Sequence, residues 1–219
     1  MSADSSPPPK DHPQSGRIRP DEAKLEDRLW AYSDAVFAVI VTIMVLQLRP
    51  PRSHHFSALL GLWPTVISYV ASYAFIAIIW INYHHLTRFV QSPSLGLVWL
   101  NFLHLFLVSL IPFTTAWMAQ TRLASAPVIV YAGLFVSAAS AFNILEHHVL
   151  KQTTLVARPS RRIARRRSLL ALLLFGIAII GAAFEPWLGF ALVCSALVLH
   201  VKPDVGSSRG TLKLQRRGS

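Results

Sequence analysis

Asp34 is an acidic residue inside an apolar stretch that begins Arg28-Leu-Trp-Ala-Tyr-Ser-Asp. If the stretch is a membrane helix, Asp34 lies about two turns inside it. An ionisable group at membrane depth is costly unless it is paired or hydrated, so such a residue is functional or specifically bound. The alternative is that Asp34 lies at a shallow depth, at the cytoplasmic interface. The sequence leaves both interpretations open and favours the first.

The partner of Asp34 is expected on another helix, because Arg28 lacks the i+3 or i+4 spacing that places two side chains together. Polar residues end the second apolar stretch, Trp80-Ile-Asn82-Tyr-His84, and begin the third, Leu100-Asn101-Phe-Leu-His104. A buried network would satisfy these groups and fix the packing of the helices. The expected members are Arg28, Ser33, Asp34, Trp80, Asn82, His84 and Asn101.

Three histidine pairs raise the question of metal transport: His54-His55, His84-His85 and His147-His148. Adjacent histidines on a helix point about 100° apart and do not chelate one ion together. No cysteine or carboxylate cluster accompanies them. The sequence also lacks a nucleophile paired with a base and a glycine-rich phosphate loop. We therefore predict no catalytic residues, no metal site and no cofactor.

The composition indicates a membrane protein. Of 219 residues, 53% are hydrophobic and 14% are charged, and the mean hydropathy is +0.45. A soluble domain of this length would be more polar. The net charge of +11 does not indicate a nucleic-acid partner, since the basic residues lie between the apolar segments and are better explained as a topology signal. Cys194 lies alone inside an apolar run and is expected to be a structural thiol.

The sequence predicts an all-α integral membrane protein with six transmembrane helices. Residues 168–201 form one apolar stretch that Glu185-Pro186 divides into halves of about 17 residues, the low end of the spanning range. Proline is favoured at a helix start, which predicts a hairpin there, with a re-entrant half as the alternative. The expected spans are 28–48, 56–83, 94–118, 127–150, 167–184 and 187–201. The domain covers 25–201, between disordered cytoplasmic tails at 1–24 and 202–219.

The basic residues provide an independent test of the number of spans. With the N-terminus in the cytoplasm, 18 of the 21 lysines and arginines fall on the cytoplasmic side. Cytoplasmic loops are enriched in these residues. The external loops would hold Arg49, Arg52 and Arg122. An odd number of helices would move the basic C-terminal segment outside, so both termini are expected in the cytoplasm.

Three stretches resemble the bacterial relatives of the lysosomal potassium channel called transmembrane protein 175. Residues 28–48 resemble the first helix of that family, with an arginine, a Ser-Asp pair and an apolar run containing threonine. Trp80-Ile-Asn82-Tyr-His84 resembles its Trp-x-Asn-His-His segment, and residues 100–115 resemble its third helix. The sequence departs from the family pattern at Tyr32, Gln47, Tyr83 and Thr114.

The resemblance implies a potassium-permeable cation channel in the bacterial plasma membrane, with four subunits around a central pore. The expected partners are potassium ions, the lipid bilayer and copies of the same chain. The family lacks the Thr-Val-Gly-Tyr-Gly filter, as does this sequence. Its selectivity is attributed to an apolar constriction of the first helix with a threonine layer. The resemblance assigns that constriction to Val39, Thr42 and Leu46.

The spacing of Val39, Thr42 and Leu46 is compatible with this assignment, since offsets of three and seven place them on one helical face. One helix cannot enclose a pore, so the stripe requires an oligomer. From the residues alone, lipid or a neighbouring helix explains such a stripe better, and a threonine often bonds its own helix. Two other functions stay open: an ion- or proton-coupled transporter that uses Asp34, the histidines and Glu146, and a membrane scaffold whose loop 158–167 binds anionic lipid or a partner.

Overall fold

The structure is a computed structural model that describes residues 20–90, 94–152 and 158–200. Most of the two expected tails lies outside these ranges. Residues 20–24, assigned to the first tail, instead form the start of α1, because Pro20 suits the first helical position. The helices are α1 Pro20–Leu46, α2 Ser57–Leu60, α3 Trp63–Thr87, α4 Leu95–Ser109, α5 Ile111–Gln120, α6 Ser125–Gln152, α7 Arg158–Phe184 and α8 Pro186–His200.

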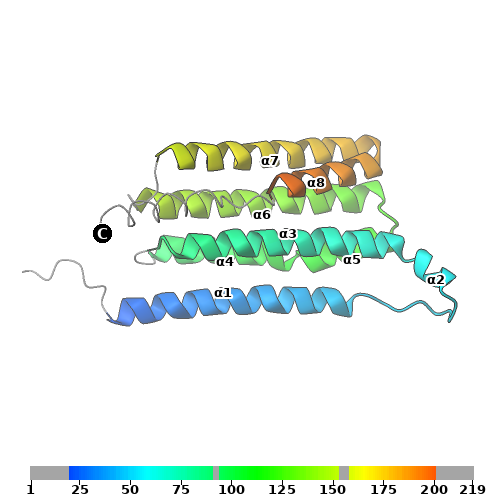
Figure 1. The fold of residues 1–219 in the computed structure, drawn as a ribbon, viewed down its shortest axis with the longest axis horizontal. Helices are drawn as coiled ribbons and strands as arrows, with labels where there is room; N and C mark the ends of the chain where they lie inside the picture. Colours follow the sequence, from blue (N-terminus) through cyan, green and yellow to red (C-terminus); the bar gives the residue numbers. More distant parts are fainter. Residues whose placement is uncertain (1–19, 91–93, 153–157, 201–219) are drawn as a thin grey trace, which may run out of the picture.

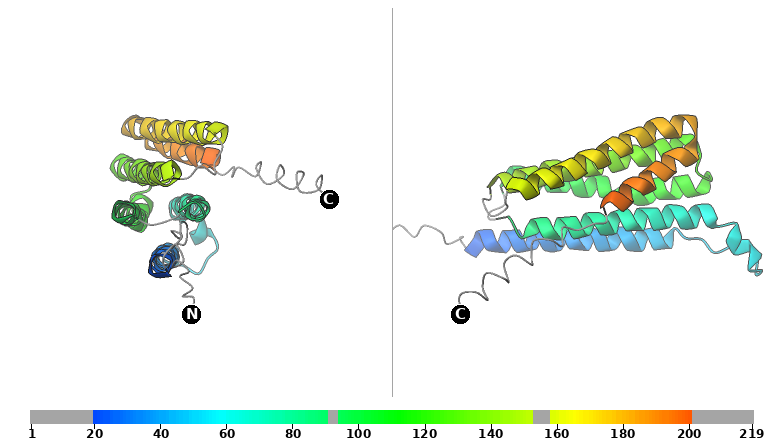
Figure 2. Two further views of the ribbon diagram at one scale, coloured as in Figure 1. Left: turned by 90° about the vertical axis from the view of Figure 1, so that its left-hand side faces the viewer. Right: turned by 45° about the horizontal axis from the view of Figure 1, so that its top comes forward.

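The long helices lie side by side and alternate in direction (Figure 1). Helix α1 lies at one edge of the bundle and packs on α3, α4 and α5. Helix α7 lies at the opposite edge, against α6 and α8, as the second views confirm (Figure 2). An aromatic cluster joins α3, α6 and α7: the Phe75 and Phe135 rings stack with centroids 3.6 Å apart, and Phe175 meets both edge-on. This aromatic part of the core lies away from α1, which has neighbouring helices on one side only.

Within the described residues, four helical segments are long and apolar enough to cross a membrane: Asp27–Leu46, Trp63–Thr87, Leu95–Gln120 (α4 with α5) and Ser125–Lys151. The apolar segments Ser168–Phe184 and Pro186–Val198 are shorter. They meet in the tight hairpin expected at Glu185-Pro186, since α7 ends at Phe184 and α8 begins at Pro186. The helical pattern thus follows the six expected segments, of which four have full spanning length.

Two prolines shift the expected boundaries. The second span was expected from residue 56, but α3 begins at Trp63, with Pro64 in its first turn, and the short α2 precedes it. The third span was expected to be one helix, but it is interrupted at Leu110, where α4 ends and α5 begins. Pro112 has no N–H with which to continue the ladder of hydrogen bonds to the carbonyl of Val108.

Residues 158–167 form the start of α7 rather than a loop, because arginine is a good helix former.

The alternating directions bring most basic residues to one end of the bundle. The start of α1, the end of α3, the end of α6 and the start of α7 all lie at the left end in Figure 1. Arg28, Arg88, Lys151 and Arg166 therefore lie at or near that end. The α1–α2 and α5–α6 links, which carry Arg49, Arg52 and Arg122, lie at the other end.

Candidate pore helix and its polar network

Helix α1 has a buried face and an exposed face of different composition. The buried stripe consists of Leu29, Ser33, Phe37, Ile40 and Met44. This spacing of three and four residues is that of one helical face. Val39, Thr42 and Leu46 lie on the other side; Val39 is 54% exposed and Leu46 is 81% exposed. In a single chain, the side chains of these three candidate constriction residues therefore face away from the other helices.

Thr42 bonds its own helix. Its hydroxyl donates a hydrogen bond to the carbonyl oxygen of Val39, at 2.8 Å. The single hydroxyl proton is thus used within α1, while the lone pairs of the oxygen stay available. An exposed oxygen whose proton is occupied behaves as an acceptor, which is the character that a cation requires.

A buried polar cluster joins α1, α3 and α4 on the opposite face. The phenol oxygen of Tyr83 lies 2.7 Å from Ser33 Oγ and 2.7 Å from Asn101 Oδ1. Asn101 Nδ2 donates to Ser33 Oγ at 3.0 Å, and Ser33 Oγ lies 2.9 Å from the carbonyl oxygen of Leu29. Ser33 and Asn101 are fully buried and Tyr83 nearly so. The cluster gives three helices a polar contact that holds only in one register.

Asp34 lies apart from this cluster. It is exposed, and its Oδ1 accepts a hydrogen bond from the indole N–H of Trp80 at 2.9 Å. The imidazole of His84 stacks on Trp80, with ring centroids 5.6 Å apart. Neighbouring residues on a helix point about 100° apart, so Ser33 enters the bundle while Asp34 lies on its flank. The single network expected from the sequence is therefore two separate groups.

Two of the expected members, Arg28 and Asn82, do not join either group. Within the described part of the chain, Arg28 and Asn82 form no hydrogen bond with either group, and Arg28 is exposed. Tyr83, which the sequence analysis noted only as a departure from the family, lies at the centre of the buried cluster. The sequence could have indicated this role, because Tyr83 lies between two polar residues, Asn82 and His84, and a buried phenol needs a hydrogen-bond partner.

A second group of hydroxyls ties α3, α5 and α6 together. Ser72 Oγ lies 2.7 Å from Thr115 Oγ1 and 2.8 Å from the phenol oxygen of Tyr131. His104 of α4 is also fully buried, and its Nδ1 lies 3.2 Å from the carbonyl oxygen of Ala138. These contacts hold the helices behind α1 in place.

The groups expected for a coupled transporter are not brought together. Asp34 is on α1 and the partly buried Glu146 is on α6, with α4 packed between these helices. The histidine pairs lie at separate places along the bundle, His54-His55 beyond α1 and His147-His148 near the end of α6. In the ranges that the structure describes, no group of three His, Cys, Asp or Glu side chains could hold a metal ion.

Sequence comparisons place the similarity on the helices that build this site. Residues 28–112 match the family model described as the endosomal/lysosomal potassium channel TMEM175. A potassium channel of Chamaesiphon minutus is 34% identical over 147 residues, which are 62% of this chain and 71% of the relative. A potassium channel of a Chryseobacterium species is 28% identical over 178 residues, which are 81% of this chain and 93% of the relative.

The fold is similar to a solved structure. It matches the crystal structure of a lysosomal potassium-selective channel TMEM175 homolog from Chamaesiphon minutus with a TM-score of 0.72 at 27% identity. The match covers 81% of this chain and 96% of the solved chain. The similarity therefore extends over the helices after residue 112 as well.

Proposed function

Because this chain belongs to the TMEM175 family of potassium channels, we propose that it conducts potassium through a pore lined by the exposed face of α1. Four copies would surround the pore, each with Val39, Thr42 and Leu46 turned toward the axis. The observation that carries this proposal is the exposure of these three side chains on a helix at the edge of the bundle. A single α1 cannot enclose an ion path, so the stripe gains a role only in an oligomer.

The chemistry of the stripe suits a selective constriction. Rings of Val39 and Leu46 side chains offer no oxygen ligands, so a permeating ion must shed water or the pore must widen. Potassium loses water more readily than sodium and would therefore pass more easily. Thr42 lies between the two rings, and its hydroxyl proton is bonded to the carbonyl oxygen of Val39. Its oxygen would face the ion as an acceptor and offset part of the dehydration cost.

We propose that all six apolar segments cross the bacterial inner membrane, with both termini in the cytoplasm. The apolar part of α7 and the whole of α8 are short for a full crossing, but local thinning of the bilayer accommodates such a length at modest cost. The end of the bundle with Arg28, Arg88 and Lys151 would be cytoplasmic under the positive-inside rule. On this proposal the chain acts as a channel and not as an enzyme.

The test uses purified protein in planar bilayers with opposing potassium and sodium gradients, and measures unitary currents and reversal potentials. Leu46→Ala widens the neck, so we expect a higher conductance and a reversal potential closer to zero. Leu46→Asn makes the neck hydrophilic and should remove any barrier from dewetting. Thr42→Val removes the polar layer and should reduce the current, whereas Thr42→Ser keeps the hydroxyl and should retain it.

The matched control is Leu173→Ala on α7, which is 62% exposed at the opposite edge of the bundle. It removes the same atoms from a surface that faces lipid in the proposed arrangement, and should leave selectivity and conductance unchanged. If the Leu46 and Thr42 variants all conduct like the unmodified protein, α1 is not the filter. Absence of single-channel steps in any condition would instead favour a transporter.

A further inference from the structure

Helix α7 begins with a strongly basic segment. Of its first ten residues, six are arginine and none is lysine, aspartate or glutamate. Like charges four residues apart on a helix repel one another, and positive charges near a helix N-terminus oppose the macrodipole. An anion beside this segment would relieve both effects. The six residues are Arg158, Arg161, Arg162, Arg165, Arg166 and Arg167.

The outer face of α7 changes from apolar to basic along the helix. The apolar members of this face are 50% to 62% exposed and recur every three or four residues, at Leu169, Leu173, Ile177 and Ile180. The same steps lead back from Leu169 to Arg166, Arg162 and Arg158. Arg166 is itself exposed, and the buried Ala171 and Phe175 lie on the opposite side of the helix. One face thus carries leucine and isoleucine first and arginine beyond them.

The change coincides with the membrane surface in the proposed arrangement. The apolar segment of α7 begins at Ser168. At about 1.5 Å per residue, Arg166 lies about 3 Å before Ser168, Arg165 about 4.5 Å and Arg162 about 9 Å. The headgroup layer on each side of a bilayer is about 5–8 Å thick. Arg165 and Arg166 would therefore lie within that layer, and Arg162 at its edge.

We propose that Arg162, Arg165 and Arg166 bind the phosphate of an anionic phospholipid of the cytoplasmic leaflet, whose acyl chains lie along Leu169 and Leu173. Offsets of three and four residues place the three arginines next to one another on the helix. A guanidinium group binds two phosphate oxygens at once, whereas lysine acts as a point charge. Orientation in the membrane requires only positive charge, which lysine would supply equally, so the exclusive use of arginine favours a phosphate contact. This inference rests on the proposed crossing of α7 and does not require the pore.

The neighbouring helices offer little negative charge to these arginines. Helix α7 packs on α6 and α8 and lies at the edge of the bundle away from α1 (Figure 1). Within Ser125–Gln152, α6 carries one carboxylate, Glu146, together with Lys151. Within Pro186–His200, α8 carries no acidic residue. One carboxylate cannot neutralise six arginines, so the segment keeps a strong positive charge for an external anion.

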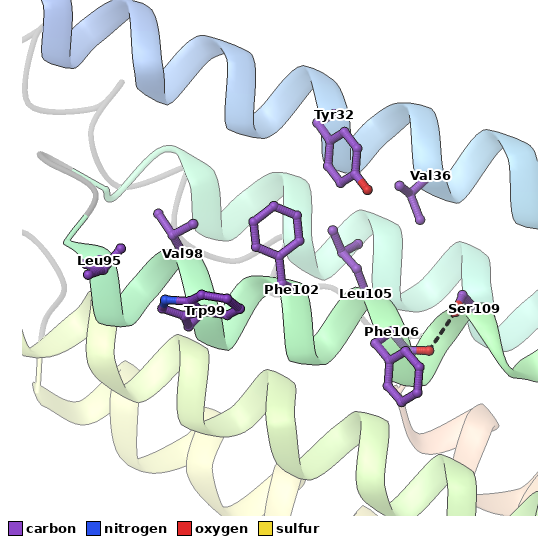
Figure 3. Close-up of a pocket in the computed structure, with 9 residues that line it drawn as sticks. All are labelled: Tyr32, Val36, Leu95, Val98, Trp99, Phe102, Leu105, Phe106 and Ser109. Carbon is purple, nitrogen blue, oxygen red and sulfur yellow. Dashed lines mark hydrogen bonds between the residues drawn. The ribbon is translucent and has the colours of Figure 1, made fainter.

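The groove between α1 and α4 provides a contrast. It has a volume of about 640 Å³, and its nine lining residues, among them Tyr32, Trp99 and Phe106, are all uncharged (Figure 3). This groove has apolar surface but no group that prefers an anionic headgroup to a zwitterionic one. A preference for anionic lipid should therefore come from α7.

The test measures the binding of fluorescent phosphatidylglycerol and phosphatidylcholine to the purified full chain in a neutral detergent. Both lipids carry a phosphate and acyl chains, but only phosphatidylglycerol has a net negative charge, so we expect the protein to bind it more tightly. The triple variant Arg162→Gln, Arg165→Gln and Arg166→Gln should bind it about tenfold more weakly or worse, because a hydrogen bond to a charged group is worth about a factor of ten. Lysine at the same three positions keeps the charge and should weaken the binding by less.

The matched control is the triple variant Arg88→Gln, Lys151→Gln and Arg158→Gln. It removes the same charge from the same end of the bundle but leaves the proposed contact intact, and should retain the preference for phosphatidylglycerol. Trp99→Ala, in the groove, should retain it as well. Inorganic phosphate should displace little of the bound lipid, because it lacks the acyl chains that lie along Leu169.

Variants are compared when their mass from light scattering and their midpoint of thermal unfolding match those of the unmodified protein. The inference is overturned if the glutamine triple binds phosphatidylglycerol like the unmodified protein, if the control triple loses as much, or if inorganic phosphate displaces all the lipid. Should the glutamine triple not fold, the lysine triple decides, since an affinity equal to that of the unmodified protein overturns the paired phosphate contact.

The same chain can be tested for the crossing on which this inference rests. In the Cys194→Ser background, Arg158→Cys should react with a membrane-impermeant maleimide only after lysis. Labelling in intact cells would overturn the proposed crossing, and with it the cytoplasmic leaflet as the source of the lipid. Labelling only after lysis, together with unchanged lipid binding in the glutamine triple, would overturn this inference alone.

Discussion

The indole N–H of Trp80 and the carboxylate of Asp34 form a 2.9 Å hydrogen bond at the surface of the bundle, between α3 and the flank of α1. Both side chains are exposed, although Asp34 begins an otherwise apolar part of the helix. The bond gives the Asp34 carboxylate one strong hydrogen-bond donor, and the second oxygen of the carboxylate stays open to other donors. This pair therefore positions α1 from outside, while the cluster of Ser33, Tyr83 and Asn101 positions it from within.

Trp80→Phe removes the donor to Asp34 and keeps an aromatic ring. We expect a loss in stability at or below about 1.5 kcal/mol, the lower end for bonds to charged groups, since both partners are exposed. Thermal unfolding in detergent measures it. Trp117→Phe on α5 is the control, and should have little effect. Asp34→Asn keeps an acceptor oxygen and should retain stability; if it nevertheless changes the current, Asp34 faces the ion path.

Tyr83→Phe removes one hydroxyl from the buried cluster and leaves Asn101 Oδ1 without that donor. An unsatisfied buried polar group costs about 1–3 kcal/mol, so we expect a lower midpoint of thermal unfolding. Tyr69→Phe, on the same helix and only partly buried, is the matched control. Equal midpoints for both variants would show that the Tyr83 hydroxyl contributes nothing to packing.

Gly189→Ala should separate the α7–α8 hairpin. A Cβ at Gly189 would lie only 2.4 Å from the Cβ of Ala182, and 2.7 Å from its Cα, so the two helices must move apart. Overpacking of this kind costs about 1–3 kcal/mol. Ala182→Gly in the same chain removes only the Cβ contact, since the Cα and N of residue 182 would still lie 2.7 and 2.8 Å from the new Cβ, so it should restore only part of the stability.

The control for that prediction is Gly176→Ala, because a Cβ there meets nothing within 4 Å. Alanine is favoured over glycine inside a helix by about 0.5–1 kcal/mol, so this variant should be neutral or more stable. If Gly189→Ala behaves like Gly176→Ala, the close approach of α7 and α8 is not a feature of the folded protein.

Both termini should be inaccessible from outside the cell. In the Cys194→Ser background, a membrane-impermeant maleimide should fail to label Ser5→Cys and Ser208→Cys in intact cells and label both after lysis. Arg122→Cys, in the link between α5 and α6, should be labelled without lysis. Efficient external labelling at either terminus would contradict the six-span arrangement.

Much of the fold and the family was predictable from local patterns. Apolar blocks of membrane length mark the helices, and Glu185-Pro186 marks the hairpin, because proline ends one helix and starts another. The resemblance to the potassium channel family is confirmed by the comparisons, and it was carried by short motifs around Asp34, Asn82 and Asn101. These are properties of sequence order and spacing, which need no knowledge of which helices touch.

The partners of the polar residues depended on tertiary structure. Spacing along α1 puts Ser33 and Asp34 on different sides, but it does not say that Tyr83 enters toward Ser33 while Trp80 reaches Asp34. That choice depends on how far α3 is rotated and shifted against α1. The apolar groove between α1 and α4 likewise appears only once α4 is packed on α1. Local sequence determines each helix, whereas rotation and register are set by side-chain packing summed over residues far apart in the chain.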